Sequence, residues 1–449
     1  MSRDVAPKQQ DQREVALTLA GPTPKTLGFT DQAAFWANLG VSLLGFSGAL
    51  TVLAPAGFPQ LSILAAVAAT VVGTVLGSVM VGLSAVPGAR TGAPSMVLLR
   101  GLFGTRLSYV PTVLNVLQLV GWGTFELLVI AQGLEAIFHG GPHWLYVVLV
   151  GAVTTLLTLR PLGMLRLLRR YVTIAVAIAM VYLFVQVLRH PLPDLSTGSW
   201  RGFWAGADAA LAVAVSWIPV ASDYSRHSRS TGAAFAAASV GYSVTQVLTY
   251  VLGLLALALV AGDPQRAFDP FLAVPLGAVF FGVLVLREVD QSFANVYSTA
   301  VSLQNVRPTA DRRVLSIGVG LLVTVLASTL DIGQYAGFLT LIGSVFVPLF
   351  GVLAADYFLR GRGRSWDLSA NAPSRWGMLL AWATGLVTYQ LINPGSVGWW
   401  SQVWTKVQHA LGITPTGWTS ASLLSFVVAA AIAHLANVVG SRRREAVWR

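Results

Sequence analysis

Three carboxylates lie inside long apolar stretches, where an ionised group is hard to accommodate. Glu126 closes the run Gln118-Leu-Val-Gly-Trp-Gly-Thr-Phe-Glu126, while Glu288 and Asp290 directly follow Arg287 in a second run. An ionised side chain in the middle of a bilayer costs about 2.5–3.5 kcal/mol even on a lenient scale. We therefore expect these acids to face a polar cavity and to bind a substrate or a coupling ion. The alternative is that Arg287 neutralises Glu288 or Asp290 and only stabilises the fold.

An aromatic ring and an acid share one helical face beside the first of these acids. Gln118, Trp122 and Glu126 are spaced four residues apart, so their side chains follow one face of a helix. An indole can stack on a flat heterocycle while a carboxylate accepts hydrogen bonds from its N–H groups. We expect Trp217 to form the opposite wall and Ser216 to add hydrogen bonds; the alternative for each tryptophan is ordinary packing.

The composition requires a membrane around these side chains. The chain has 449 residues, of which 55% are hydrophobic and only 10% charged, and its mean hydropathy is +0.68. Soluble proteins carry about 25% charged residues. Soluble enzymes are therefore excluded, and the sequence predicts an all-α integral membrane protein. The absence of cysteine excludes disulfides and thiol chemistry.

Apolar runs predict about twelve membrane spans with both termini in the cytoplasm. Most Lys and Arg residues then lie on the inner side, and only Arg189, Arg201, Arg266 and Lys406 fall outside, as the positive-inside rule requires. The net charge of +11 is thereby explained by topology rather than by nucleic-acid binding. The predicted spans are 33–55, 60–84, 108–137, 143–159, 170–189, 203–221, 234–261, 271–303, 313–330, 335–359, 376–394 and 421–440.

Two predicted spans carry helix-breaking residues at corresponding places. The first contains Gly45 and Gly48 with Pro55 near its outer end, and the sixth contains Trp217-Ile218-Pro219. Interrupted helices in a membrane survive where they line a cavity. Breaks in spans one and six fit a five-plus-five inverted repeat with a binding site at mid-membrane; the alternative is the ordinary tolerance of membrane helices for glycine and proline.

The expected organisation follows from that repeat. The tryptophan-rich stretch 395–419 is expected at the membrane interface, because indole rings favour that depth. The parts are an N-terminal cytoplasmic tail at 1–30, a first repeat at 31–190, a second repeat at 200–360, peripheral helices at 361–440 and a basic cytoplasmic tail at 441–449.

Two other classes of membrane protein fit the sequence less well. An intramembrane enzyme needs a metal set or a nucleophile with its base, and the six histidines are scattered without a His-x-x-x-His or Glu-x-x-His pattern. A channel could be lined by the two broken helices, but nothing indicates a ring of identical filter segments.

The sequence resembles the nucleobase–cation symporter-1 family, the permeases for cytosine, purines, allantoin and hydantoins. The resemblance runs from about Phe35 to Phe358. Four short motifs carry it by their order and spacing: Leu44-Gly-Phe-Ser-Gly-Ala49, Gly121-Trp-Gly123, Ser216-Trp-Ile-Pro219 followed by Asp223-Tyr-Ser-Arg226, and Asn295-Val-Tyr-Ser298.

The resemblance implies the inverted-repeat fold of the amino acid–polyamine–cation superfamily, with ten core helices and two peripheral ones. It also implies that the substrate stacks between Trp122 and Trp217, with Glu126 where some relatives have glutamine. Sodium-coupled members hold the cation between carbonyls of the first span, near Gly45 and Gly48, and hydroxyls of the eighth.

The chain departs from that pattern in the eighth span. The positions of the paired threonines and the asparagine of sodium-coupled relatives fall near Asp290, Gln291 and Ser292, so that two hydroxyls are replaced by an acid and an amide. A carboxylate could ligate sodium directly or carry a proton itself. Both ions remain open, and we favour the proton.

Together these features predict a secondary-active, cation-coupled importer of a nucleobase-like heterocycle that works by alternating access. Amino-bearing bases should be preferred, and allantoin, a hydantoin or a hydroxymethylpyrimidine is the alternative substrate. We expect an inner-membrane monomer without a cofactor. The predicted substrate residues are Trp122, Glu126, Gln118, Ser216, Trp217, Ala49, Glu288 and Ser292, and the predicted cation residues are Gly45, Gly48, Asp290 and Gln291.

Overall fold

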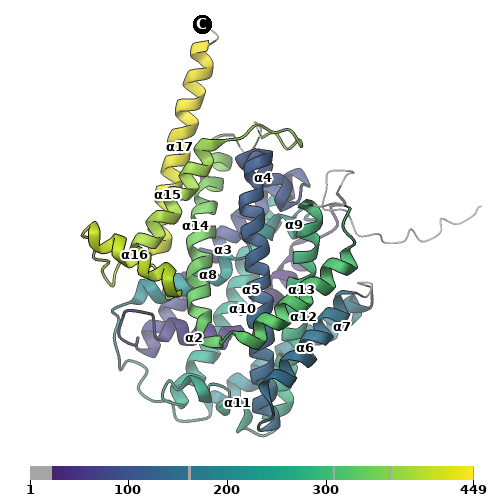
Figure 1. Ribbon diagram of the computed structural model, residues 1–449. Coiled ribbons are helices and arrows are strands. Elements are labelled where there is room, and N and C mark those ends of the chain that lie inside the picture. Colours follow the sequence, from purple (N-terminus) through teal and green to yellow (C-terminus); the bar gives the residue numbers. More distant parts are fainter. Residues whose placement is uncertain (1–22, 160–162, 307–308, 362, 364–365, 448–449) are drawn as a thin grey trace, which may run out of the picture.

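The computed structural model describes residues 23–159, 163–306, 309–361, 363 and 366–447. Helices pack side by side over these residues (Figure 1), and the only pairings of β type among them are two isolated bridges, Leu27 with Ser228 and Leu61 with Ser199. The all-α fold predicted from composition is therefore confirmed for the described chain.

The first half of the bundle contains one broken helix and several long ones. Its helices are α1 (Phe29–Leu39), α2 (Leu44–Leu53), α3 (Ile63–Thr91), α4 (Ser95–Phe103), α5 (Thr105–Phe138), α6 (His143–Thr158) and α7 (Gly163–Leu188).

The second half repeats the pattern of a broken helix followed by long ones. Its elements are α8 (Phe203–Val215), η1 (Ile218–Val220), α9 (Ala221–Ser225), α10 (Thr231–Leu259), η2 (Pro264–Arg266), α11 (Asp269–Leu272), α12 (Gly277–Val306), α13 (Arg312–Thr329), η3 (Ile332–Gln334) and α14 (Tyr335–Leu359).

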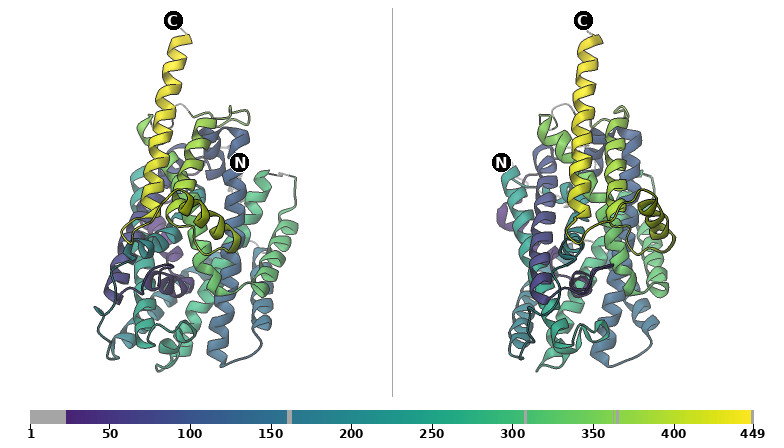
Figure 2. Two further views of the ribbon diagram at one scale, coloured as in Figure 1. Left: turned by 60° about the vertical axis from the view of Figure 1, so that its left-hand side comes forward. Right: turned by 90° about the vertical axis from the view of Figure 1, so that its left-hand side faces the viewer.

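Three further helices follow at the C-terminal end: α15 (Trp376–Ile392), α16 (Gly398–Ala410) and α17 (Ala421–Val447). The last of these, α17, packs on α14 and α15 and continues beyond the end of the bundle (Figures 1 and 2). The tryptophan-rich segment forms the short α16, on which Trp399 is exposed. Its place at the membrane interface stays a prediction.

Each of the twelve predicted spans coincides with one of these helices or with a broken pair. By length and apolar composition alone, seven described helices could cross a membrane, and the bent pair α1–α2 makes an eighth. Helices α6 and α15 are shorter, and α12 carries the charged run at 287–290. The exact count, the repeat boundaries and the cytoplasmic placement of both termini stay predictions.

The first broken helix is interrupted earlier than the sequence suggests. Helix α2 continues through Gly45 and Gly48, and the break lies at residues 40–43, where α1 and α2 meet at an angle of 68°. The two glycines instead allow α10 to approach, because a Cβ on Gly48 would lie 2.1 Å from the Tyr250 hydroxyl. Placing the break at these glycines was therefore wrong, since close packing and not helix interruption explains them.

The second break lies where the sequence predicts it. Helix α8 ends at Val215, and a single 3-10 turn containing Pro219 leads into α9. Proline has no N–H to donate and disfavours a continuous helix. The turn is held by Ser95 of α4, whose Oγ accepts a hydrogen bond from the Ser222 N–H at 3.0 Å. The two broken helices therefore occupy matching places in the two halves of the chain.

Candidate functional site

A hollow lies where the two breaks meet. Helices α5, α10, α12 and α14 complete its walls. Its lining includes eleven residues whose side chains can stack or form hydrogen bonds, namely Ser42, Trp122, Glu126, Ser216, Trp217, Tyr242, Gln246, Tyr250, Gln291, Asn295 and Tyr335. The hollow is therefore mixed in character, with aromatic walls and a polar edge.

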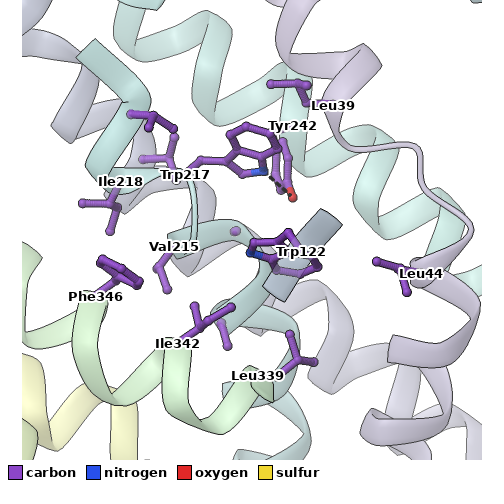
Figure 3. Close-up of a cluster of buried hydrophobic side chains, with 14 of the residues drawn as sticks. Leu39, Leu44, Trp122, Val215, Trp217, Ile218, Tyr242, Leu339, Ile342 and Phe346 are labelled. Carbon is purple, nitrogen blue, oxygen red and sulfur yellow. Dashed lines mark hydrogen bonds between the residues drawn. The ribbon is translucent and has the colours of Figure 1, made fainter. Parts of the chain in front are cut away.

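Two tryptophans from different helices line this hollow. Trp122 of α5 and Trp217 in the second break are both buried, and Figure 3 shows Trp122 across from Trp217 and Tyr242. The Trp217 indole N–H donates to the Tyr242 hydroxyl at 3.1 Å, while Trp122 packs edge-on against Phe338 with ring centroids 5.3 Å apart. Packing and hydrogen bonds thus fix both rings from behind.

Glu126 lies at the polar edge of the same hollow. Its side chain is fully buried, and both carboxylate oxygens accept hydrogen bonds of 2.9 Å from Nδ2 of Asn295 on α12. A carboxylate has about four lone-pair positions, so acceptor capacity remains for a ligand. The acid that the sequence singles out is thereby placed between the two halves of the fold.

Several buried polar groups around the hollow have no partner among the described residues. They include the indole N–H of Trp122 and the Gln246 side-chain oxygen. Buried polar groups are almost always hydrogen-bonded in native proteins, so unsatisfied ones call for an explanation. A ligand with donors and acceptors at its edge would supply the missing partners.

Gln118 supports the hollow from behind instead of lining it. Its side-chain Nε2 donates to the backbone oxygen of Ser216 at 2.8 Å and to Asn115 Oδ1 at 3.0 Å. Because Ser216 lies in the second break, this contact satisfies a carbonyl that the interruption leaves free. The structure therefore brings Gln118, Trp122 and Glu126 onto one face, as their spacing predicts, but gives Gln118 a different contact.

Glu288 lies outside the central hollow and contacts the first break. Its Oε1 accepts a hydrogen bond from Ser42 Oγ at 2.5 Å, and its Oε2 accepts one from the Leu43 N–H at 3.0 Å. Arg287 directs its hydrogen bonds to Asn38 and Gln291. Both residues are packed closely against the break.

The remaining predicted residues divide between the hollow and the surrounding packing. Gly45 and Gln291 line the hollow. Ser292 faces α6, where its Oγ lies 3.4 Å from Thr154 Oγ1, and Ala49 packs against Gly253 of α10. Asp290 is half-buried on α12. In the part of the chain that the structure describes, no three His, Cys, Asp or Glu side chains are grouped to hold a metal ion.

Helix α10 contributes three residues to the hollow that were not predicted from the sequence. Tyr242, Gln246 and Tyr250 all line the hollow, and they recur every fourth residue in an otherwise apolar span. This polar stripe is the signal that could have identified them, since such spacing places side chains on one helical face. Tyr335 and Ser42 have no comparable signal, because each lies beside a helix end.

Two broken helices around an aromatic and acidic hollow define a helical membrane transporter. Residues 31–372 match the family described as permeases for cytosine/purines, uracil, thiamine and allantoin. The chain belongs to this family, which confirms the resemblance stated above and makes the protein a transporter and not an enzyme. No curated protein matches the sequence.

Solved structures agree with this assignment of the fold. Mhp1, a nucleobase-cation-symport-1 family transporter solved closed with bromovinylhydantoin bound, is 17% identical; the match covers 93% of this chain and 96% of Mhp1 with a TM-score of 0.67. The inward-facing conformation of Mhp1 gives 16% identity, coverages of 94% and 93%, and a TM-score of 0.71. A manganese transporter from Eremococcus coleocola is more distant, with 12% identity, coverages of 96% and 100%, and a TM-score of 0.55.

Proposed function

We propose that this permease imports an amino-bearing nucleobase, such as cytosine or guanine, across the inner membrane, working as a monomer with both termini in the cytoplasm. The observation that carries the proposal is the convergence of Trp122, Trp217 and Glu126 on one hollow between the two helix breaks. Rings of this kind stack on indoles through their faces and form hydrogen bonds only at their edges. The hollow offers both kinds of contact.

The preference for amino-bearing bases rests on the acid. An ionised carboxylate only accepts hydrogen bonds, so Glu126 suits an edge with N–H and NH2 donors and disfavours a carbonyl-rich edge such as that of uracil. Asn295 supports this role, because its amide holds both carboxylate oxygens from the side of α12. Ser216 and the unpartnered Gln246 oxygen can complete the edge contacts.

We further propose that a proton couples uptake. Three carboxylates lie on the two helices α5 and α12, namely Glu126 on the first and Glu288 and Asp290 on the second. On α12, two of the hydroxyls expected for a sodium site are replaced by an acid and an amide. Of the predicted cation residues, Gly45 and Gln291 face the hollow, and Gly48 packs against Tyr250. Direct ligation of sodium by Asp290 is the competing proposal.

Allantoin, a hydantoin or a hydroxymethylpyrimidine is the alternative substrate. The unpartnered Trp122 N–H favours it, because this group can donate to a carbonyl oxygen of such a molecule. The mechanism of transport would be unchanged, with helices rocking around a mid-membrane site.

Competition uptake by cells or proteoliposomes tests the proposal. We expect cytosine and guanine to inhibit uptake of a labelled base, with uracil and allantoin much weaker, and a protonophore to abolish uptake in sodium-free buffer. Trp122→Ala should raise the apparent Kd by about 10-fold or more, because stacking on one aromatic ring contributes ~1–3 kcal/mol. Trp399→Ala, which changes an exposed tryptophan, is the control. A uracil-selective profile would overturn the substrate, and sodium-stimulated uptake that resists the protonophore would overturn the ion.

A further inference from the structure

The break between α1 and α2 leaves two helix ends inside the protein. The last carbonyls of a helix have no partner within it and carry partial negative charge, while the first N–H groups carry partial positive charge. The last turn of α1 contains Asn38, and the N-terminal end of α2 begins at Leu43 and Leu44. Each end therefore needs a partner of opposite charge from elsewhere in the fold.

Arg287 of α12 supplies that partner for the end of α1. Its side chain is 1% exposed, and its NH2 group donates to the backbone oxygen of Asn38 at 2.5 Å and to Gln291 Oε1 at 3.0 Å. Its Nε donates to the Asn38 side-chain oxygen at 3.1 Å. A buried guanidinium thus lies at the negative end of a half-helix.

Glu288, the next residue along, supplies the partner for the start of α2. Its carboxylate is fully buried and accepts from the Leu43 N–H and the Ser42 hydroxyl. The two neighbouring charges of α12 therefore contact opposite ends of the same break. This arrangement differs from an ion pair that only neutralises itself, because each charge forms hydrogen bonds with the broken helix.

We propose that Arg287 is the resident cation of the first break and that the protein binds no sodium ion there. In transporters with broken helices, unwound carbonyls and half-helix C-terminal ends are the places where coupling cations bind. Here a guanidinium already occupies such an end. The guanidinium alone would repel a sodium ion about 4 Å away by about 4 kcal/mol at a typical effective dielectric constant. The Glu288 carboxylate would offset part of this repulsion, but its oxygens already accept hydrogen bonds from Ser42 and from the Leu43 N–H. This inference rests on the proposed function for its link to uptake, but it concerns the break itself.

A substitution with chemical rescue tests the role of the guanidinium. Arg287→Ala should lower uptake about 10-fold or more, because hydrogen bonds from a charged group to buried acceptors are lost, and added guanidinium chloride at millimolar concentration should restore a substantial part. Arg266→Ala, which changes an exposed arginine paired with Asp269, should leave uptake unchanged with or without guanidinium. For a merely structural arginine, guanidinium would raise the unfolding temperature of Arg287→Ala together with its uptake, whereas the proposal expects uptake to recover at an unchanged unfolding temperature.

The need for sodium is measured separately and without a substrate. The purified wild-type protein should unfold at the same temperature in sodium chloride and in choline chloride, because a ligand stabilises a protein only if it binds the folded state. Uptake at a fixed proton gradient should also be equal in the two salts. Failure of any base to bind would refute the proposed function and leave this comparison intact.

Two results would overturn the inference. One is a higher unfolding temperature or a several-fold faster uptake of the wild type in sodium. The other is an Arg287→Ala protein that is folded and either fully active or not rescued by guanidinium. Should Arg287→Ala fail to fold, Arg287→Lys decides: retained uptake without sodium supports a positive charge at this place, and loss of uptake by a folded Arg287→Lys protein contradicts it.

Discussion

Individual side chains at the hollow have separable tasks. Trp122 and Trp217 offer ring faces, and Glu126 offers acceptors at the edge. Gln118 holds the Ser216 carbonyl of the second break from behind. Because these tasks fall on different residues, substitutions should change affinity, selectivity and the shape of the break independently.

Glu126→Gln should relax selectivity more than it lowers activity. A glutamine keeps an oxygen for the Asn295 amide but replaces one acceptor with a donor, so cytosine should compete about 10-fold less well while uracil improves. Competition uptake with both bases measures the change. Glu135→Gln alters a half-buried acid paired with His143 on the surface and should change neither value. An unchanged cytosine-to-uracil ratio in Glu126→Gln would show that the acid does not bind the substrate.

Residues in and behind the hollow could be predicted where they share one face of a single helix, because spacing along the sequence then relates them. Gln118, Trp122 and Glu126 follow from four-residue spacing, and the Tyr242 stripe could have been found in the same way. The contacts of Glu288 with Ser42 and Leu43 join residues about 245 positions apart, and no spacing rule relates such segments. Only the fold could therefore show whether Glu288 contacts a substrate, an ion or a helix end.

At the level of elements, the two breaks have different causes. Pro219 interrupts the second broken helix through its own chemistry, and the sequence locates this break correctly. The first break contains no proline and lies at residues 40–43, where Gly40 packs against α10. Gly45 and Gly48 do not interrupt α2, because a helix tolerates glycine at a cost of only about 1 kcal/mol. Tertiary contact, which the sequence does not display, decides where this helix ends.

Gly40→Ala should disturb the first break by steric overlap. An added Cβ would lie 2.2 Å from Thr245 Oγ1 and 2.9 Å from the Tyr242 backbone oxygen, and such overpacking typically costs ~1–3 kcal/mol. We expect a lower unfolding temperature and reduced uptake, with partial recovery in Gly40→Ala/Thr245→Ala. Gly232→Ala, at a position with open space, is the control. An unfolding temperature equal to that of the wild type would show that α10 can move aside.

At the level of the whole molecule, a buried polar cluster joins the C-terminal helices to the core. Asp356 of α14 accepts hydrogen bonds from Arg375 at 2.5 and 2.8 Å, from the Trp366 indole and from Asn437 of α17. Arg375 also donates to the Gly101 carbonyl of α4 at 2.6 Å. The cluster thereby ties α4, α14 and α17 together at one end of the bundle.

Asp356→Ala and Arg375→Ala should each lower the free energy of unfolding strongly. In the double variant the two losses should not add. Breaking a buried ion pair by removing one partner costs up to ~3–5 kcal/mol. The cost of Arg375→Ala should be the smaller of the two, because Arg360 lies 3.9 Å from Asp356 and still compensates its charge, whereas the double variant removes both Asp356 and Arg375. Thermal unfolding of the two single variants and the double variant gives the coupling energy. If the two losses simply add, the helices are joined by packing rather than by this pair.

Helix α5 contacts the hollow, the second break and α12 through three residues on one face. Gln118, Trp122 and Glu126 span only two turns, about 12 Å along one straight rod, yet they touch the second break, the hollow and α12 in turn. A bound ring that displaces Trp122 should also strain the neighbouring hydrogen bonds, from Gln118 to Ser216 and from Asn295 to Glu126. We therefore expect substrate binding at Trp122 to displace the contacts that Gln118 and Glu126 make on either side of it, because no loop separates the three residues on α5.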